Sequence, residues 1–346
     1  MIAPTILNAI ADIQKATTFS DLVNGSGDAK ATFRIYAKAV HPDTAPSRYV
    51  KRAEAAFGQL KRLYDEFENG DAGRTSAPTT IVTKRRAYVF GSKIADGDMS
   101  ALYRASYHED DVTHAVTLKV TRDSRNNDLA QNEAKVLRHL AEHMETPLGL
   151  PYVSQLLDSF GYRDAATGVT HQVNALASIG EGWYTLSQVK TAYPDGLDIR
   201  DVMWMWKRLL IAVGHAHRAG VVHGAVVPEH VLINGPAHGL MLVDWSYARI
   251  EPFGALSAIV PHRRSMYPPE VLNKESVSAS TDIFMSARTI ETLFNDATPT
   301  AFRRFIKGCT DARPEDAWQL MHELSDLALS HFPRRFRPFE IPKGTE

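Results

Sequence analysis

The stretch from Val221 to Arg249 restricts the possible folds of this 346-residue chain more than any other segment. It reads VVHGAVVPEHVLINGPAHGLMLVDWSYAR, and its short apolar runs are bounded by polar side chains. His223 follows the first run, His230 precedes the second, and Asp244 follows the last.

The same stretch resembles the catalytic loop and the metal-binding loop of the protein-kinase family. In that family the first loop reads His-Arg-Asp and then Lys-Pro-Glu-Asn, and the second reads Asp-Phe-Gly. The matching residues here are His223, Pro228, Glu229 and Asp244. The resemblance implies an α+β, two-lobed protein-kinase-like fold, with a β-rich small lobe and an α-rich large lobe.

Two working positions of the family differ in this chain. Ala225 stands at the catalytic Asp, which accepts the proton of the substrate hydroxyl, and a methyl group cannot do this. His230 stands at the metal-binding Asn, and a neutral imidazole is a poor ligand for magnesium. Asp244 is left as a ligand for one magnesium ion. We therefore expect no catalytic residue in the degenerate loop of His223, Ala225 and His230, and predict a pseudokinase.

Further positions of the kinase frame concern nucleotide binding. Gly97 is the one glycine that survives of the three in the family's glycine-rich loop, where backbone amides approach phosphates. Lys119 in VTLKV matches the third-strand lysine, and Glu133 in NEAKVLRHL matches its helix partner. With Asp244, these are the candidate nucleotide-binding residues. ATP and magnesium are the only cofactors that the resemblance implies.

Three other matches are structural. Glu270 in YPPE resembles the glutamate that closes the activation segment, and Arg313 matches the arginine that pairs with it. Asp282 matches the aspartate that supports the catalytic loop from the central helix of the large lobe. The segment 294–301 is very short, and family kinases usually place a substrate-docking helix there. Its absence is a second reason to doubt protein phosphorylation.

The N-terminal part has a different pattern. Apolar spacing predicts helices over about residues 4–15, 28–40 and 49–68. The text FRIYAKAVHPDTAP and AEAAFGQLKRLYDEF resembles the J domain of DnaJ-type co-chaperones, a small all-α domain. That resemblance implies binding of a DnaK-type heat-shock chaperone through a basic row and a His-Pro-Asp loop. The corresponding residues are Lys30, Arg34, Lys38, His41, Pro42 and Asp43.

These patterns divide the chain into four parts. We expect a J-like domain over 1–70, a small lobe over 86–180, and a large lobe with a C-terminal tail over 181–346. Between the first two we expect a flexible linker over 71–85, because residues 69–80, NGDAGRTSAPTT, are rich in Gly, Ser, Thr and Pro.

Composition limits the possible partners. The formal net charge of −1 gives no global reason to expect nucleic acid or a membrane surface. The single cysteine excludes an internal disulfide, which fits a reducing compartment. No apolar run approaches the roughly 20 residues of a membrane span, and the N-terminus lacks the basic start of a signal peptide. We therefore expect a cytoplasmic protein.

Three functions are compatible with the sequence. The first is an adaptor, in which the J-like domain recruits a chaperone while the kinase-like domain binds a protein client, a partner or a nucleotide. The second is an atypical kinase or nucleotide-dependent phosphotransferase, with Glu229 or His230 as the base. The third is a nucleotide-sensing pseudokinase scaffold with no chaperone partner. Ala225 and the missing docking helix favour the first and third.

Overall fold

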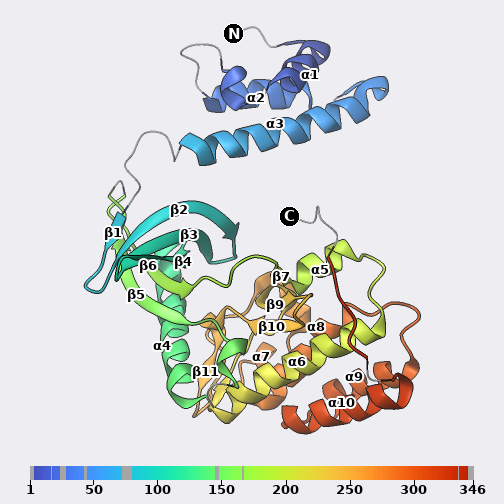
Figure 1. Cartoon of the computed structure of the whole chain (residues 1–346). Coiled ribbons are helices and arrows are strands. Elements are labelled where there is room, and N and C mark those ends of the chain that lie inside the picture. The colour runs from blue at the N-terminus through green and yellow to red at the C-terminus, as the bar shows by residue number, and fades with distance from the viewer. Residues whose placement is uncertain are drawn as a thin grey trace. The chain divides into compact units, whose positions relative to one another are not determined.

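The computed structural model describes residues 4–16, 18–23, 29–42, 45–71, 80–144, 148–165, 167–333 and 335–341. The chain forms two compact units (Figure 1). The first comprises Met1–Thr80 with Val89–Lys93, and the second comprises Ile81–Tyr88 with Ile94–Glu346. No helix among the described residues has the length and apolar character needed to cross a bilayer.

Three helices make up most of the first unit: α1 (Ile6–Lys15), α2 (Ala29–Ala39) and α3 (Val50–Asp71). Apolar residues at helical spacing bury Ile10 and Ile13 of α1 against Leu60 and Leu63 of α3. The ring of Phe33 on α2 stacks on Tyr64 at a centroid distance of 4.2 Å, which fixes α2 on α3. The three helices predicted from the apolar spacing are therefore present.

The segment 71–85, predicted as a linker, includes helical and strand residues near its two ends. Asp71 is the last residue of α3, so the helix continues beyond the predicted end at 68. Thr80–Val82 forms strand β1, whose Ile81 is buried, as suits a β-branched residue on the inner face of a sheet. Residues 72–79 lie outside the described residues.

The small lobe contains a six-stranded sheet with the strand order β1-β2-β3-β4-β6-β5. The remaining strands are β2 (Ala87–Asp96), β3 (Ser100–Glu109), β4 (Val112–Thr121), β5 (Leu156–Arg163) and β6 (Thr170–Ala177). Asp110 and Asp111 join β3 to β4 with φ of 50° and 60°, the left-handed conformation of a two-residue hairpin turn. Helix α4 (Asn127–His143) packs against this sheet (Figure 1).

Helix α6 (Ile199–Arg218) lies at the centre of the large lobe and contacts α8 (Ala279–Glu291) and α10 (Ala317–His331). The helix begins at Ile199, because Asp198 caps it by accepting from the backbone N–H of Arg200. The other elements are α5 (Leu186–Ala192), α7 (Pro269–Leu272), α9 (Thr300–Asp311), β7 (Tyr184–Thr185), β8 (Val221–Val222), β9 (Val231–Asn234), β10 (Gly239–Leu242) and β11 (Arg249–Ile250).

Residues 335–341 of the tail pack on the large lobe. The ring of Phe339 is buried, and Arg337 forms an ion pair with Asp198 at 3.1 Å. Tyr193 donates from its hydroxyl to the backbone carbonyl of Glu340 at 2.5 Å. The described part of this basic, aromatic tail is thus a structural element of the large lobe.

Candidate functional site

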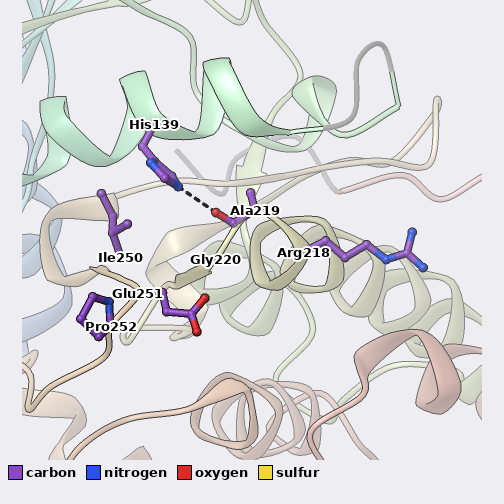
Figure 2. A pocket seen from close by; sticks show the side chains of 7 residues that line it. All are labelled: His139, Arg218, Ala219, Gly220, Ile250, Glu251 and Pro252. Atoms are coloured by element: carbon purple, nitrogen blue, oxygen red, sulfur yellow. Dashed lines mark hydrogen bonds between the residues drawn. The ribbon is translucent and has the colours of Figure 1, made fainter.

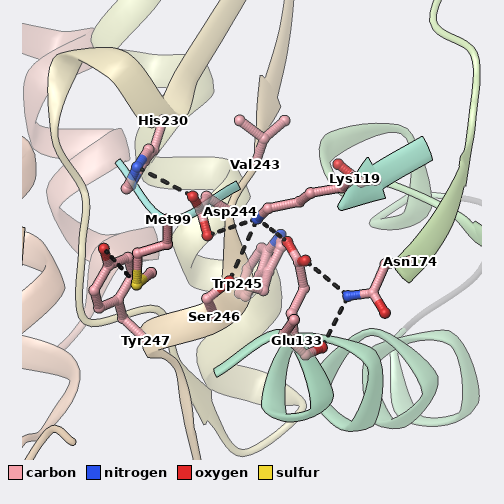
Figure 3. Close-up of polar contacts among 12 residues, drawn as sticks. Met99, Lys119, Glu133, Asn174, His230, Val243, Asp244, Trp245, Ser246 and Tyr247 are labelled. Atoms are coloured by element: carbon pink, nitrogen blue, oxygen red, sulfur yellow. Dashed lines mark hydrogen bonds and ion pairs between the residues drawn. The ribbon is translucent and has the colours of Figure 1, made fainter. Parts of the chain in front are cut away.

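The candidate site lies where β4, α4 and the loop after β10 meet (Figure 3). Lys119 extends from β4, and its Nζ donates to Glu133 Oε1 of α4 at 2.8 Å. The same Nζ donates to Asp244 Oδ1 at 2.9 Å and to Ser246 Oγ at 3.3 Å. The Lys119 ammonium group is therefore held between the carboxylates of Glu133 and Asp244, which lie 111 residues apart in sequence.

Electrostatics keeps Lys119 charged although only 7% of the residue is exposed. Burial alone would lower the pKa of Lys119, but the carboxylates of Asp244 and Glu133 outweigh it and raise the pKa above its usual value. For Asp244, burial would raise the pKa, but Lys119 and His230 lower it below the ordinary range. The pair is fully ionised at neutral pH.

Glu133 is fixed from a second side by Asn174 of β6. Asn174 Nδ2 donates to Glu133 Oε2 at 2.9 Å and to the Ala130 carbonyl at 2.8 Å. Its Oδ1 accepts from Ser159 Oγ at 2.8 Å. Both oxygens of a carboxylate that is 1% exposed are thus satisfied. No sequence motif points to Asn174, which lies beside Lys119 because the two residues are register partners of β6 and β4.

Asp244 has the left-handed backbone conformation, with φ 61° and ψ 65°, which directs its side chain back toward Lys119. Its side chain is 23% exposed. His230 lies beside it at the end of the short 3₁₀ turn Pro228–His230, with Nε2 3.5 Å from Asp244 Oδ2. The other ring nitrogen, Nδ1, lies 2.9 Å from the backbone carbonyl oxygen of Ala225.

The loop that carries Ala225 is held in place by Asp282. The carboxylate of Asp282 accepts from the backbone N–H groups of His223 at 2.7 Å and Gly224 at 2.8 Å. His223 Nε2 lies 3.0 Å from the Val243 carbonyl oxygen, and burial lowers the pKa of this imidazole to about 4. The ring is neutral and structural. Ala225 is fully buried and presents no proton acceptor.

Glu229, a candidate base, is held by Arg263 in the 3₁₀ turn Pro261–Met266. Arg263 Nε donates to both carboxylate oxygens, at 3.1 and 3.0 Å, and Nη2 makes a further bond to Oε1. Burial raises the pKa of Glu229, but the hydrogen bonds from Arg263 lower it by more, so the pKa lies below its ordinary value. A carboxylate with a lowered pKa and a bidentate partner is a weak general base.

The turn between β2 and β3 reaches down to the large lobe. Met99 Sδ lies 3.8 Å from the Tyr247 hydroxyl, and Asp98 Oδ2 lies 3.3 Å from His262 Nδ1. Figure 3 shows Met99 and Tyr247 next to Asp244. The N–H of Gly97 donates to the Ser100 carbonyl at 2.8 Å and closes the turn between β2 and β3.

The predicted structural pair is present. Arg313 Nη1 donates to Glu270 Oε2 at 2.9 Å, and Nη2 donates to Oε1 and, at 3.0 Å, to Ser280 Oγ. Thr281 Oγ1 donates to Glu270 Oε1 at 2.8 Å. These bonds join α7 to α8 and to the segment that precedes α10.

The candidate chaperone-binding residues lie in the first unit. Lys30, Arg34 and Lys38 are exposed on α2. The ring of His41 meets the ring of Phe57 edge-on at a centroid distance of 5.5 Å. Pro42 follows in the loop, and Asp43 lies outside the described residues.

A separate hollow of about 420 Å³ lies beside the end of α6 (Figure 2). Its lining includes His139, whose Nε2 lies 2.8 Å from the Ala219 carbonyl oxygen, and Arg218, which lies over the ring of Trp318. Both side chains are thus engaged in packing. The buried charges converge at Lys119 instead, and we place the candidate site there.

Protein kinases are among the known proteins that this chain resembles in sequence and in fold. No protein-family model matches the chain. The chain is 24% identical over 208 residues to the serine/threonine-protein kinase ppk21 of Schizosaccharomyces pombe, which covers 58% of this chain and 35% of that kinase. It is 28% identical over 96 residues to casein kinase II subunit alpha' of Saccharomyces cerevisiae, which covers 28% of each protein. The chain therefore matches about a third or less of the length of these relatives.

Solved structures show the same class of fold. The kinase domain of BubR1 aligns with a TM-score of 0.56 at 14% identity, over 74% of this chain and 84% of that domain. A second kinase domain aligns with a TM-score of 0.51 at 15% identity, over 64% of this chain and 67% of its own length. The chain contains a protein-kinase-like domain with two lobes.

Proposed function

We propose that the kinase-like domain binds a nucleoside triphosphate, with a divalent cation, between Lys119 and Asp244. The observation that carries this proposal is the contact of Lys119 Nζ with both Glu133 and Asp244 at 2.8 and 2.9 Å. In phosphotransferases of this fold, the lysine–glutamate pair and the metal-binding aspartate must both be in place. This chain keeps all three residues in contact.

The donor set fits a cation that is shared with phosphates. Asp244 Oδ1 accepts from Lys119, and Oδ2 faces His230. Among the described residues, no three His, Cys, Asp or Glu side chains converge on one point. The protein would therefore supply one or two ligands, and nucleotide phosphates and water would supply the rest, as is common for nucleotide-bound cations.

The geometry favours binding over transfer. Ala225 offers no atom that could accept a proton, and Glu229 is engaged by Arg263. The nearest titratable group to Asp244 on the catalytic loop is His230, whose Nδ1 is engaged by the Ala225 carbonyl. The resemblance to named kinases supports the enzyme alternative, in which His230 replaces the missing base. The two alternatives differ in a measurable product.

The test is a calorimetric titration of the full chain with ATP, with and without a divalent cation. We expect saturable binding that requires the cation and that weakens at least tenfold in Asp244→Asn. Parallel incubation with radioactive ATP should leave the protein and generic substrates unlabelled. Labelling that disappears in His230→Ala would overturn the binding-only proposal in favour of an atypical kinase. Failure to bind ATP under any condition would overturn both.

For the first unit, we propose the adaptor function: recruitment of a DnaK-type chaperone. The support is the placement of His41 and Pro42 in the loop between α2 and α3, next to the exposed row of Lys30, Arg34 and Lys38. A positive row of this kind accelerates encounter with a complementary acidic surface.

The test of the adaptor function is the ATPase rate of a DnaK-type chaperone with the full chain. We expect stimulation that is lost in His41→Gln and reduced in the double substitution of Lys30 and Arg34 by Ala. The matched control replaces Lys51 and Arg52, two exposed cations of α3, and should keep the stimulation. An ATPase rate that the wild-type chain leaves unchanged would contradict chaperone recruitment.

A further inference from the structure

The protonation and orientation of the His230 ring bear on which metal ion the site would bind. A backbone carbonyl oxygen can only accept a hydrogen bond, so the 2.9 Å contact with Ala225 places a proton on Nδ1 of His230. In the neutral imidazole, Nε2 then keeps its lone pair. Figure 3 shows this nitrogen facing the carboxylate of Asp244.

An imidazole held in this way is prepared to bind a metal. Histidines that ligate metals almost always donate their other ring N–H to a carbonyl or carboxylate, which fixes the tautomer and the ring orientation. Here the Ala225 carbonyl provides that contact. The ring of Tyr247 also lies nearly parallel to His230, with a centroid distance of 6.0 Å and an interplanar angle of 26°.

The spacing of the two side chains supports the same reading. Nε2 and Asp244 Oδ2 are 3.5 Å apart, which is longer than the roughly 2.7–3.2 Å of a typical N–H···O hydrogen bond. Two neighbouring ligands that each lie about 2.1 Å from one ion are about 3.0 Å apart at an octahedral angle and about 3.4 Å apart at a tetrahedral angle. The observed separation is close to the larger of these values, so the two atoms can bind one ion after a small shift of either side chain.

From this geometry we infer that the cation of the site is a first-row transition ion, such as Mn²⁺, in preference to Mg²⁺; this inference rests on the proposed nucleotide binding. Mg²⁺ prefers oxygen ligands, whereas imidazole nitrogen suits transition ions. Asp244 Oδ2 and His230 Nε2 would supply one oxygen and one nitrogen, and phosphate oxygens and water would complete the coordination. The preference between the two ions changes because His230 offers an imidazole nitrogen where the kinase family has the amide oxygen of Asn.

The experiment uses the full chain with ATP and compares Mn²⁺ with Mg²⁺. We expect ATP to bind at least tenfold more tightly with Mn²⁺, and pulsed electron paramagnetic resonance of the bound Mn²⁺ to show coupling to an imidazole nitrogen. In His230→Asn, which restores an amide oxygen, the nitrogen coupling should vanish and the preference should shrink. The control His322→Asn alters an exposed histidine of α10 and should retain both signals.

The outcomes separate the two proposals. If ATP binds equally with both ions and no nitrogen coupling appears, the cation inference fails and nucleotide binding stands. In that case His230 and Asp244 form an ordinary imidazolium–carboxylate pair. If ATP binds with neither ion, nucleotide binding fails, and the cation inference fails with it.

Discussion

Replacement of Glu133 by Gln tests whether the buried network of Lys119, Glu133 and Asn174 stabilises the small lobe of the kinase-like domain. Lys119 Nζ and Asn174 Nδ2 both donate to the Glu133 carboxylate, at 2.8 and 2.9 Å. A glutamine offers one oxygen and one NH₂ group, so one donor must face another donor. Asn174 cannot turn to relieve this, because Ala130 and Ser159 hold its two amide atoms.

The cost of Glu133→Gln can be bounded. An unsatisfied buried donor costs about 1–3 kcal/mol, and the loss of one partner from a buried ion pair costs about 3–5 kcal/mol. Since Lys119 keeps Asp244, we expect a loss of about 3 kcal/mol in the free energy of unfolding. For a unit of this size, that corresponds to a fall of about 6–12 °C in melting temperature.

Tryptophan fluorescence is the appropriate assay for Glu133→Gln. All five tryptophans lie in the second unit, so their signal follows the kinase-like domain alone. The matched control is Glu142→Gln, which alters an exposed residue near the end of α4 and should change the melting temperature little. A fall of less than about 2 °C in Glu133→Gln would refute the network of Lys119, Glu133 and Asn174.

Arg313→Ala should lower the free energy of unfolding by about 2–3 kcal/mol, less than for a fully buried pair because the side chains are 27% and 17% exposed; Arg304→Ala, an exposed cation of α9, is the control for this urea titration. The pKa of His223 is lowered to about 4 in the folded state, so protonation of this buried ring opposes folding. The free energy of unfolding should therefore be highest above pH 6.5 and should fall by about 3 kcal/mol as the pH is lowered to about 4. A free energy of unfolding that stays constant between pH 6.5 and 4 would contradict this. Burial raises the pKa of Cys309 to about 12, so a thiol reagent at pH 8 should label it only when urea unfolds the chain, and rapid labelling of the native protein would refute its burial.

Much of the kinase-like frame can be predicted from sequence, because its matches are ordered along the chain. Lys119, Glu133 and Asp244 are separated by distances in sequence that a two-lobed frame explains, and the structure brings their side chains together. Glu270 and Arg313 are paired for the same reason. Each motif is short and weak by itself, but the motifs occur in the order and at the spacing of the kinase family.

The rest depends on contacts that no local pattern specifies. Asn174 reaches Glu133 only because β6 pairs with β4 in one register. Arg263 engages Glu229 from a segment 34 residues away, and Met99 contacts Tyr247 from the other lobe. The strand Thr80–Val82 is not predicted from sequence because turn-forming residues precede it, although its own β-branched residues favour a sheet.

Equilibrium dialysis with radioactive ATP and Mn²⁺ tests most directly whether Lys119 and its two carboxylates form a nucleotide site. The wild-type chain should bind about one ATP, and Lys119→Met should bind at least tenfold more weakly while its circular dichroism shows that it remains folded. Lys135→Met, which alters an exposed lysine of α4, should bind like the wild type. Absence of saturable binding to the wild-type chain, or equal binding to the folded Lys119→Met variant, would contradict the account.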